Sequence, residues 1–177
     1  NISTLTNRNS RNIEKLKNIL IQYDLKTRLT KKYFFEVGIK GEIREIDSDY
    51  KVFENSIVVD SLNNVLNYKE RIYGAYAQYG NSENKFQYLI GLRVEYANTE
   101  SVDRETQFNN SKKYIDLFPT LHLTYQLTET TNLQLSYSRR IQRPNFPQIN
   151  PFNGISDRRN IRIGNPDLNP MYTNSFE

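Results

Sequence analysis

The sequence predicts an all-β fold, an antiparallel up-and-down segment of a transmembrane β-barrel with six strands and the start of a seventh. Three observations indicate it. Apolar residues recur at every second position, the alternating stretches exceed the five or six residues usual for soluble strands, and the connections alternate between short and long. A membrane strand needs about 9–11 residues, and membrane barrels have short turns at one end and longer loops at the other.

Composition excludes several other classes of protein. The 177 residues are 25% charged, and no run approaches the roughly 18 apolar residues that a transmembrane helix needs. A mean hydropathy of -0.75 would alone indicate a soluble protein, but alternation cancels the average in a membrane strand. The absence of cysteine excludes disulfides and thiolate metal sites. A net charge of +4, with basic residues scattered among acidic ones, argues against nucleic-acid binding.

We expect a fragment truncated at both ends, in which residues 1–16 are a surface loop and residues 17–177 are a single partial barrel domain. The first three strands are predicted at residues 19–29, 35–44 and 73–79, where alternate positions are apolar. These positions are Ile19, Ile21, Tyr23, Leu25 and Leu29; Phe35, Val37, Ile39 and Ile43; and Tyr73, Ala75, Ala77 and Tyr79.

The next three strands are predicted at residues 86–96, 115–127 and 133–137, and a seventh begins near Tyr172. Their apolar positions are Phe86, Tyr88, Ile90, Leu92, Val94 and Tyr96; Ile115, Leu117, Leu121, Leu123, Tyr125 and Leu127; and Leu133, Leu135 and Tyr137. Pro119 lies within the fifth strand and cannot donate a backbone hydrogen bond, so a bulge or local irregularity is predicted there.

The connections indicate which end of the barrel is which. Tight turns are predicted at residues 29–32, 80–85 and 128–131, and long polar loops at residues 47–67, 98–112 and 142–170. Aromatic residues gather near both ends of the strands, as in the interfacial girdles of membrane barrels. Those near the turns are Tyr79, Phe86, Tyr88 and Tyr125, and those near the loops are Tyr73, Tyr96 and Tyr137.

Several linked motifs occupy roughly the last quarter of the chain. They are Ser136-Tyr137-Ser138-Arg139-Arg140, Asn150-Pro151-Phe152, Gly164-Asn165-Pro166-Asp167-Leu168-Asn169-Pro170 and Tyr172-Thr173-Asn174-Ser175-Phe176-Glu177. This series resembles the barrel of a TonB-dependent outer-membrane receptor. Met171 departs from the family pattern, which usually places Glu directly after the second proline.

The resemblance implies a receptor in the outer membrane of a Gram-negative bacterium that imports a scarce ligand, either a siderophore, a glycan or a peptide. In such a receptor a plug domain fills a barrel of roughly 22 strands, and the TonB system pulls on the plug. The implied partners are therefore the plug, the TonB system, outer-membrane lipid and lipopolysaccharide.

The longest loop holds the candidate ligand-binding residues, which combine basic, amide and aromatic groups. They are Arg139, Arg140, Arg143, Asn145, Phe146, Asn150, Phe152 and Asn153. For the three arginines, anchoring of the girdle and loop is favoured over contact with lipopolysaccharide or an acidic ligand. A second set has an architectural role, because two Asn-Pro steps stiffen the reversal into the next strand. That set is Gly164, Asn165, Pro166, Leu168 and Pro170.

The polar face carries charges of both signs, which are expected to pair across strands, with contact to a plug as the alternative. These residues are Asp24, Lys26, Arg28, Glu36, Lys40, Glu42, Arg44, Arg93, Glu95, Asp116 and Arg140. The single histidine, His122, is interpreted as a wall residue. No catalytic motif is present, so we expect neither an enzyme nor a cofactor or metal site. The alternative interpretation is a soluble or surface-attached β-sandwich that binds a glycan or a protein.

Overall fold

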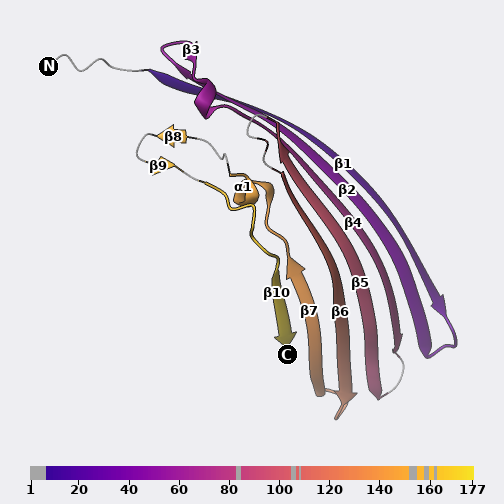
Figure 1. Cartoon of the computed structure of the whole chain (residues 1–177). Helices are drawn as coiled ribbons and strands as arrows, with labels where there is room; N and C mark the ends of the chain where they lie inside the picture. The colour runs from indigo at the N-terminus through magenta and orange to yellow at the C-terminus, as the bar shows by residue number, and fades with distance from the viewer. Residues whose placement is uncertain are drawn as a thin grey trace.

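A single curved sheet dominates the computed structural model, which describes residues 7–82, 85–104, 107, 109–151, 155–157, 160–161 and 163–177. Seven strands follow one another as neighbours in the order β1, β2, β4, β5, β6, β7 and β10, and the short β3 pairs with β2. Every pairing is antiparallel. Figure 1 shows the long strands side by side, with α1 and its loop on the concave side. The predicted all-β, up-and-down architecture is confirmed.

The strand bounds exceed those predicted. The elements of the main sheet are β1 (Arg8–Arg28), β2 (Tyr33–Glu54), β3 (Ile57–Val58), β4 (Asn64–Asn81), β5 (Phe86–Asp103), β6 (Asn109–Gln126), β7 (Asn132–Gln142) and β10 (Met171–Phe176). The remaining elements are η1 (Asp60–Leu62), α1 (Phe146–Ile149), and a separate hairpin of β8 (Ile155–Asp157) and β9 (Asn160–Ile161). Among the described residues, no helix is long and apolar enough to cross a bilayer.

The convex face of the sheet is apolar and exposed, as the alternation predicts. Ile21 is 71% exposed, Ile39 is 62% and Ile115 is 76%. A soluble sandwich would bury such residues beneath a second sheet, but the only other sheet in the described chain is the short β8–β9 hairpin. The exposed side chains therefore suit contact with lipid.

The polarity of the two faces inverts toward the loop end of the strands. Lys69 and Glu100 lie on the convex face there, because each shares a cross-strand row that continues the alternation of Tyr73 and Tyr96. The concave face instead holds buried apolar side chains, among them Ile46, Leu66 and Tyr68. Convex apolar groups with a polar lumen belong to the membrane layer, so the inversion marks where that layer ends.

Three predicted loops are wrong, at residues 1–16, 47–67 and 98–112. Much of the predicted loops at residues 47–67 and 98–112 consists of strand, because β2, β4, β5 and β6 continue through them. Strand β1 begins at Arg8, so residues 8–16 are strand where a surface loop was expected. Residues 1–6 lie outside the described chain. Each extension pairs in register with its neighbour, which explains why these polar segments are extended.

The predicted irregularity at Pro119 is also wrong. Pro119 pairs opposite Leu92 in an unbroken β5–β6 register. On the other side, β6 pairs with β7 only from Thr120 to Gln126. Proline lies immediately beyond that shorter ladder, where its missing N–H removes no bond to β7.

The turns and girdles agree with prediction. Leu29 donates to the Tyr33 carbonyl at 3.0 Å, and Leu127 donates to the Thr131 carbonyl at 2.9 Å. At the turn end, Tyr79 lies between Tyr33 and Tyr88, with ring centroids 6.1 and 5.9 Å apart. The longest connection, between β7 and β10, carries α1, β8 and β9.

Candidate functional site

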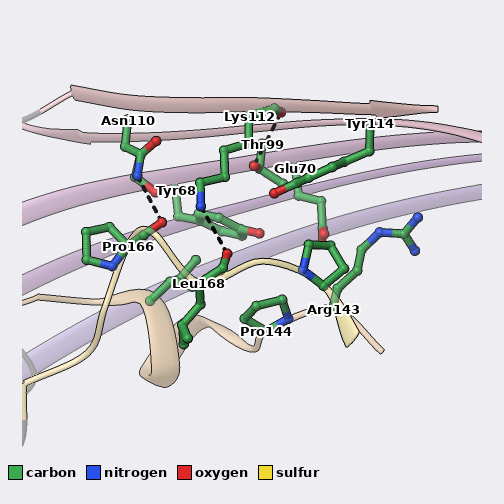
Figure 2. A pocket seen from close by; sticks show the side chains of 13 residues that line it. Tyr68, Glu70, Thr99, Asn110, Lys112, Tyr114, Arg143, Pro144, Pro166 and Leu168 are labelled. Carbon is green, nitrogen blue, oxygen red and sulfur yellow. Dashed lines mark hydrogen bonds between the residues drawn. The ribbon is translucent and has the colours of Figure 1, made fainter. Parts of the chain in front are cut away.

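The connection from Arg143 to Pro170, here the inner loop, lies against the concave face at the loop end of the sheet (Figures 1 and 2). It opens with the short helix α1, whose start is fixed by a reciprocal capping box between Asn145 and Gln148. Phe146, the first residue of α1, is buried against Tyr68 of β4, with ring centroids 5.8 Å apart. The helix therefore anchors the loop to the wall through an aromatic contact.

Polar contacts with three strand residues, Glu95, Asn110 and Lys112, tie the inner loop to the wall. The Arg143 guanidinium donates to the Glu95 carboxylate at 2.7 Å. Two carbonyls on the returning half of the loop accept from β6, that of Pro166 from Asn110 at 2.9 Å and that of Leu168 from Lys112 at 3.1 Å (Figure 2). Both halves of the loop are therefore fixed to the wall independently.

The loop is also cross-linked to itself. Gly164 donates to the Asn150 carbonyl at 3.0 Å, and Asn165 donates to the Gln148 carbonyl at 2.8 Å. A Cβ at position 164 would lie only 2.4 Å from the Asn150 oxygen. Glycine is therefore needed for this close backbone approach.

The space enclosed between the inner loop and the wall is small. Its volume is about 30 Å³, and Tyr68, Glu70, Tyr114 and Arg143 are among the residues that line it (Figure 2). A buried water needs at least about 10–15 Å³, so this space holds about two waters. A ligand can occupy it only after the loop has moved away from the wall.

Glu70 carries a buried negative charge in this space. Its carboxylate lies 3.3 Å from the Arg44 guanidinium. Burial raises the pKa of the Glu70 carboxyl, and the positive charges of Arg44 and Arg143 oppose that rise in part. Burial likewise raises the pKa of the neighbouring Tyr68 hydroxyl, and the charge of Glu70 adds to the effect.

The concave wall toward the turns is more open and positively charged. A cleft of about 360 Å³ lies between β5, β6 and β7 and is lined by Arg93, His122 and Arg140, among others. The Arg93 guanidinium covers the Phe118 ring, 4.7 Å from its centroid. Clefts of this size hold small organic molecules, and the charge favours anionic groups.

Carboxylates dominate the other side of the same wall. The Tyr76 hydroxyl on β4 lies 2.7 Å from Asp24 on β1 and 2.9 Å from Glu36 on β2. Gly38 makes this reach across β2 possible, because a Cβ there would lie 2.3 Å from both the Asp24 carboxylate and the Tyr76 ring. The Lys26 ammonium lies 3.5 Å from Glu36, an ion pair between neighbouring strands.

The comparisons with known proteins agree with this geometry. A family model described as "Outer membrane protein beta-barrel family" matches residues 1–177. The chain belongs to this family. The family places this barrel segment in the outer membrane of a Gram-negative bacterium and rules out the soluble β-sandwich. No curated protein matches the chain.

The ferric citrate transporter FecA, in its unliganded form, shares the fold of this barrel segment. The TM-score is 0.61 at 14% sequence identity, over 78% of this chain and 22% of the transporter. The ferric enterobactin receptor PfeA in complex with BCV-L6 is 13% identical over 79% of this chain and 36% of its own, with a TM-score of 0.28, too low to show a shared fold. The chain thus spans about a fifth of the length of FecA. The family and the shared fold confirm the outer-membrane barrel that the terminal motifs indicated.

Within the barrel segment, the predicted arginines face the interior. Arg140 lines the open cleft, and Arg143 holds the inner loop to Glu95. The Arg139 guanidinium stacks on Tyr172, 4.8 Å from the ring centroid, and Tyr172 donates to Asp116 at 2.8 Å. The anchoring role of the three arginines stays a prediction.

The other predicted residues lie in the inner loop. Asn145 caps α1, Phe146 packs on Tyr68, and the Asn150 carbonyl accepts from Gly164. Phe152 and Asn153 lie outside the described residues. In the architectural set, Pro166 and Leu168 contribute the carbonyls that bind β6.

The sequence does not predict the residues that the inner loop and the arginines contact. They are Tyr68, Glu70, Asn110, Lys112 and Tyr172. The first four lie in segments where the sequence predicts loops or no strand, because the convex positions there are polar and do not alternate with apolar ones.

Proposed function

We propose that this chain forms part of the wall of a TonB-dependent receptor that imports a scarce ligand across the outer membrane. The observation that carries the proposal is the inner loop, which is fixed to the concave wall at one end of a fold shared with a ferric citrate transporter. Movement of such a loop controls whether a ligand reaches the interior of the barrel. On this proposal, residues 8–177 form one partial barrel domain, with a plug and the TonB system as partners of the whole receptor.

The open cleft supports an anionic ligand, such as a ferric siderophore, more than a neutral glycan or peptide. Arg93 and Arg140 line it together with His122, and each arginine can bind a carboxylate through two N–H groups. The inner-loop residues Asn145, Phe146 and Asn150 would contact a ligand once the loop has moved, as would Phe152 and Asn153. We infer binding and transport without catalysis, as for the receptor barrels that the chain resembles.

Uptake by cells tests this function. A strain that expresses the full-length receptor is compared with a deletion strain for uptake of labelled ferric citrate, a ferric catecholate, a maltooligosaccharide and a short peptide. We expect one of the ferric complexes to accumulate only when the receptor is present, and an uncoupler of the proton gradient to abolish this accumulation.

Arg140→Gln should reduce that uptake by roughly tenfold, because a charge-assisted hydrogen bond is worth about 1.5–3 kcal/mol. Thr131→Gln, at a turn, is the matched control and should leave uptake unchanged. Uptake of all four compounds at the level of the deletion strain, with the receptor correctly inserted, would contradict the proposal.

A further inference from the structure

The backbone ladder between β6 and β7 stops well before either strand ends. Its last pair toward the loops joins Thr120 to Ser138. Both strands continue beyond that pair, but in the described chain β6 is paired there only with β5, and β7 only with β10. The wall therefore contains a seam, which lies between residues 109–119 of β6 and residues 139–142 of β7.

Part of this seam lies in the membrane layer. Leu117 and Ile115 of β6 continue the apolar pattern of the convex face, with side chains that are 50% and 76% exposed. A sheet edge without a neighbouring strand is costly in hydrocarbon, because its backbone N–H and C=O groups find no water to bind. Other contacts must therefore offset the cost of the open seam.

A side-chain hydrogen bond crosses the seam. The Tyr172 hydroxyl on β10 donates to Asp116 on β6 at 2.8 Å, although the neighbour of β10 in the sheet is β7. If the β6–β7 register continued, Asp116 would lie opposite Gln142. Tyr172 pairs with Ile141, the preceding residue of β7. Adjacent residues of a strand point to opposite faces, so a continued ladder would separate the hydroxyl from the carboxylate.

The ion pair between Arg143 and Glu95 also requires the open seam. Glu95 belongs to β5, so the guanidinium reaches past β6 to contact it. In a continued ladder, Arg143 would lie opposite Ile115 and would share its convex, apolar face. Pro144 keeps the preceding residue extended, so the Arg143 side chain would follow that alternation. Arg143 therefore cannot bind Glu95 and extend the ladder at the same time.

Pro119 lies where the ladder stops. Ser136 exchanges both of its backbone hydrogen bonds with Glu177, directly after β10, so even-numbered residues of β7 face β10 and odd-numbered residues face β6. In a continued register Pro119 would lie opposite Arg139, and proline has no N–H to donate across this pair. The missing bond weakens the closed arrangement of the two strands and favours the open seam.

We propose that docking of the inner loop and opening of the seam are two parts of one conformational switch. With the loop docked, as in the structure, Arg143 and Tyr172 hold the seam open through their bonds to Glu95 and Asp116. When the loop leaves the wall, β6 and β7 close into a longer ladder. Closure satisfies the backbone groups in the membrane layer that the docked state leaves unpaired.

This proposal depends on the outer-membrane location of the barrel segment and not on what the receptor imports. Strand pairing can be measured without any ligand. Failure of the switch and failure of the import function are therefore separate results.

Disulfide cross-linking tests the switch in isolated outer membranes that contain the full-length receptor without other cysteines. The 177 residues contain none. Leu117→Cys/Ile141→Cys places two thiols opposite each other only in the closed ladder, because a disulfide needs Cα atoms about 4.4–6.8 Å apart. Leu121→Cys/Tyr137→Cys is the matched reference, since these residues already pair in the ladder. Leu117→Cys/Leu135→Cys is out of register and should not cross-link.

Under a copper–phenanthroline oxidant, the seam pair at positions 117 and 141 should cross-link far more slowly than the reference pair. Arg143→Gln should accelerate the seam pair by about tenfold or more, the factor expected from loss of a hydrogen bond to a charged group. Pro119→Ala restores the backbone donor and Tyr172→Phe removes the bond to Asp116, so each should accelerate it a few-fold. The reference pair should keep its rate in all three variants.

Two results would overturn the proposal. Equal rates for the seam pair and the reference pair in the wild type would mean that the seam is closed while the loop is docked. A seam-pair rate that none of the three substitutions changes, with the reference pair intact, would mean that the loop contacts do not control the seam.

Discussion

At the scale of single residues, Gly38 determines how the wall is cross-braced. Because Gly38 has no side chain, the Tyr76 ring crosses β2 and its hydroxyl reaches Asp24 on β1. Three successive strands are thereby linked by one phenol, in addition to their backbone ladders.

Gly38→Ala should displace the Tyr76 ring, because the new methyl group would lie 2.3 Å from it. Overpacking of this kind costs about 1–3 kcal/mol, and thermal or urea unfolding of the receptor in detergent measures the loss. Gly41→Ala is the control, because the nearest atom to its Cβ would be Tyr73 Cδ1 at 3.7 Å, an ordinary contact. Equal stability of the two variants would show that Tyr76 is not fixed by Gly38.

The raised pKa of the Glu70 carboxyl predicts that attachment of the inner loop depends on pH. Its pKa in the folded state lies above the ordinary value of 4.5, chiefly because the carboxyl is buried. A raised pKa in an acid means that its contribution to stability is full below pH 4.5 and is lost as the pH rises through the raised value. Arg44, Arg143, Glu42 and Tyr68 are the charged or titratable groups that act on it.

We therefore expect the protection of α1 against hydrogen exchange, relative to the intrinsic exchange rate at each pH, to be greatest at acid pH and to fall as the pH rises from 4.5 to neutrality. In Glu70→Gln this part of the pH dependence should disappear, because the amide stays neutral throughout. The difference between the two pH profiles isolates Glu70 from the other acids. Identical profiles would mean that ionisation of Glu70 does not affect the loop.

At the scale of elements, the inner loop is held by a few specific contacts to different strands. The Arg143–Glu95 pair is the most buried ion pair among the described residues, with side chains 18% and 12% exposed. Removal of Arg143 leaves Glu95 with one ion-pair partner, the Arg93 guanidinium at 3.0 Å.

Arg143→Gln should destabilise the attached loop by about 1.5–3 kcal/mol, the usual contribution of a hydrogen bond to a charged group. Hydrogen exchange at residues 146–150 should accelerate, while the long strands remain protected. Lys69→Gln breaks the more exposed pair with Glu45 and is the control, with an expected cost below about 1 kcal/mol. Faster exchange throughout the sheet in Arg143→Gln would instead assign the arginine a role in the stability of the whole barrel.

At the scale of the whole molecule, the sequence predicts the membrane layer well and the layer above it poorly. Alternation located Phe86–Tyr96 because one face meets lipid and the other does not. Above that layer, Glu45 and Lys69 face outward while Ile46 and Tyr68 face inward, so the same period carries inverted polarity. A strand with polar residues on its convex face is therefore predicted as a loop, because the pattern expected of a membrane strand has apolar residues on that face.

The candidate site was predictable only in part for a different reason. The family motifs located the inner loop and its arginines, but its contacts join residues far apart in sequence, such as Glu95 with Arg143 and Asn110 with Pro166. No local pattern determines which carbonyl a distant asparagine will meet. The inversion that hides the upper strands also hides the concave partners of the loop.

Two kinds of hydrogen bond hold the wall together on either side of the point where the β6–β7 ladder ends. Backbone pairing there runs from Thr120 to Gln126, whereas farther up the inner loop meets β6 through the side chains of Asn110 and Lys112. Ladder bonds open cooperatively, but side-chain bonds break one at a time. On the proposed function, a ligand that competes for those two donors would release the loop stepwise, while the hydrogen-bonded frame of the barrel stays intact.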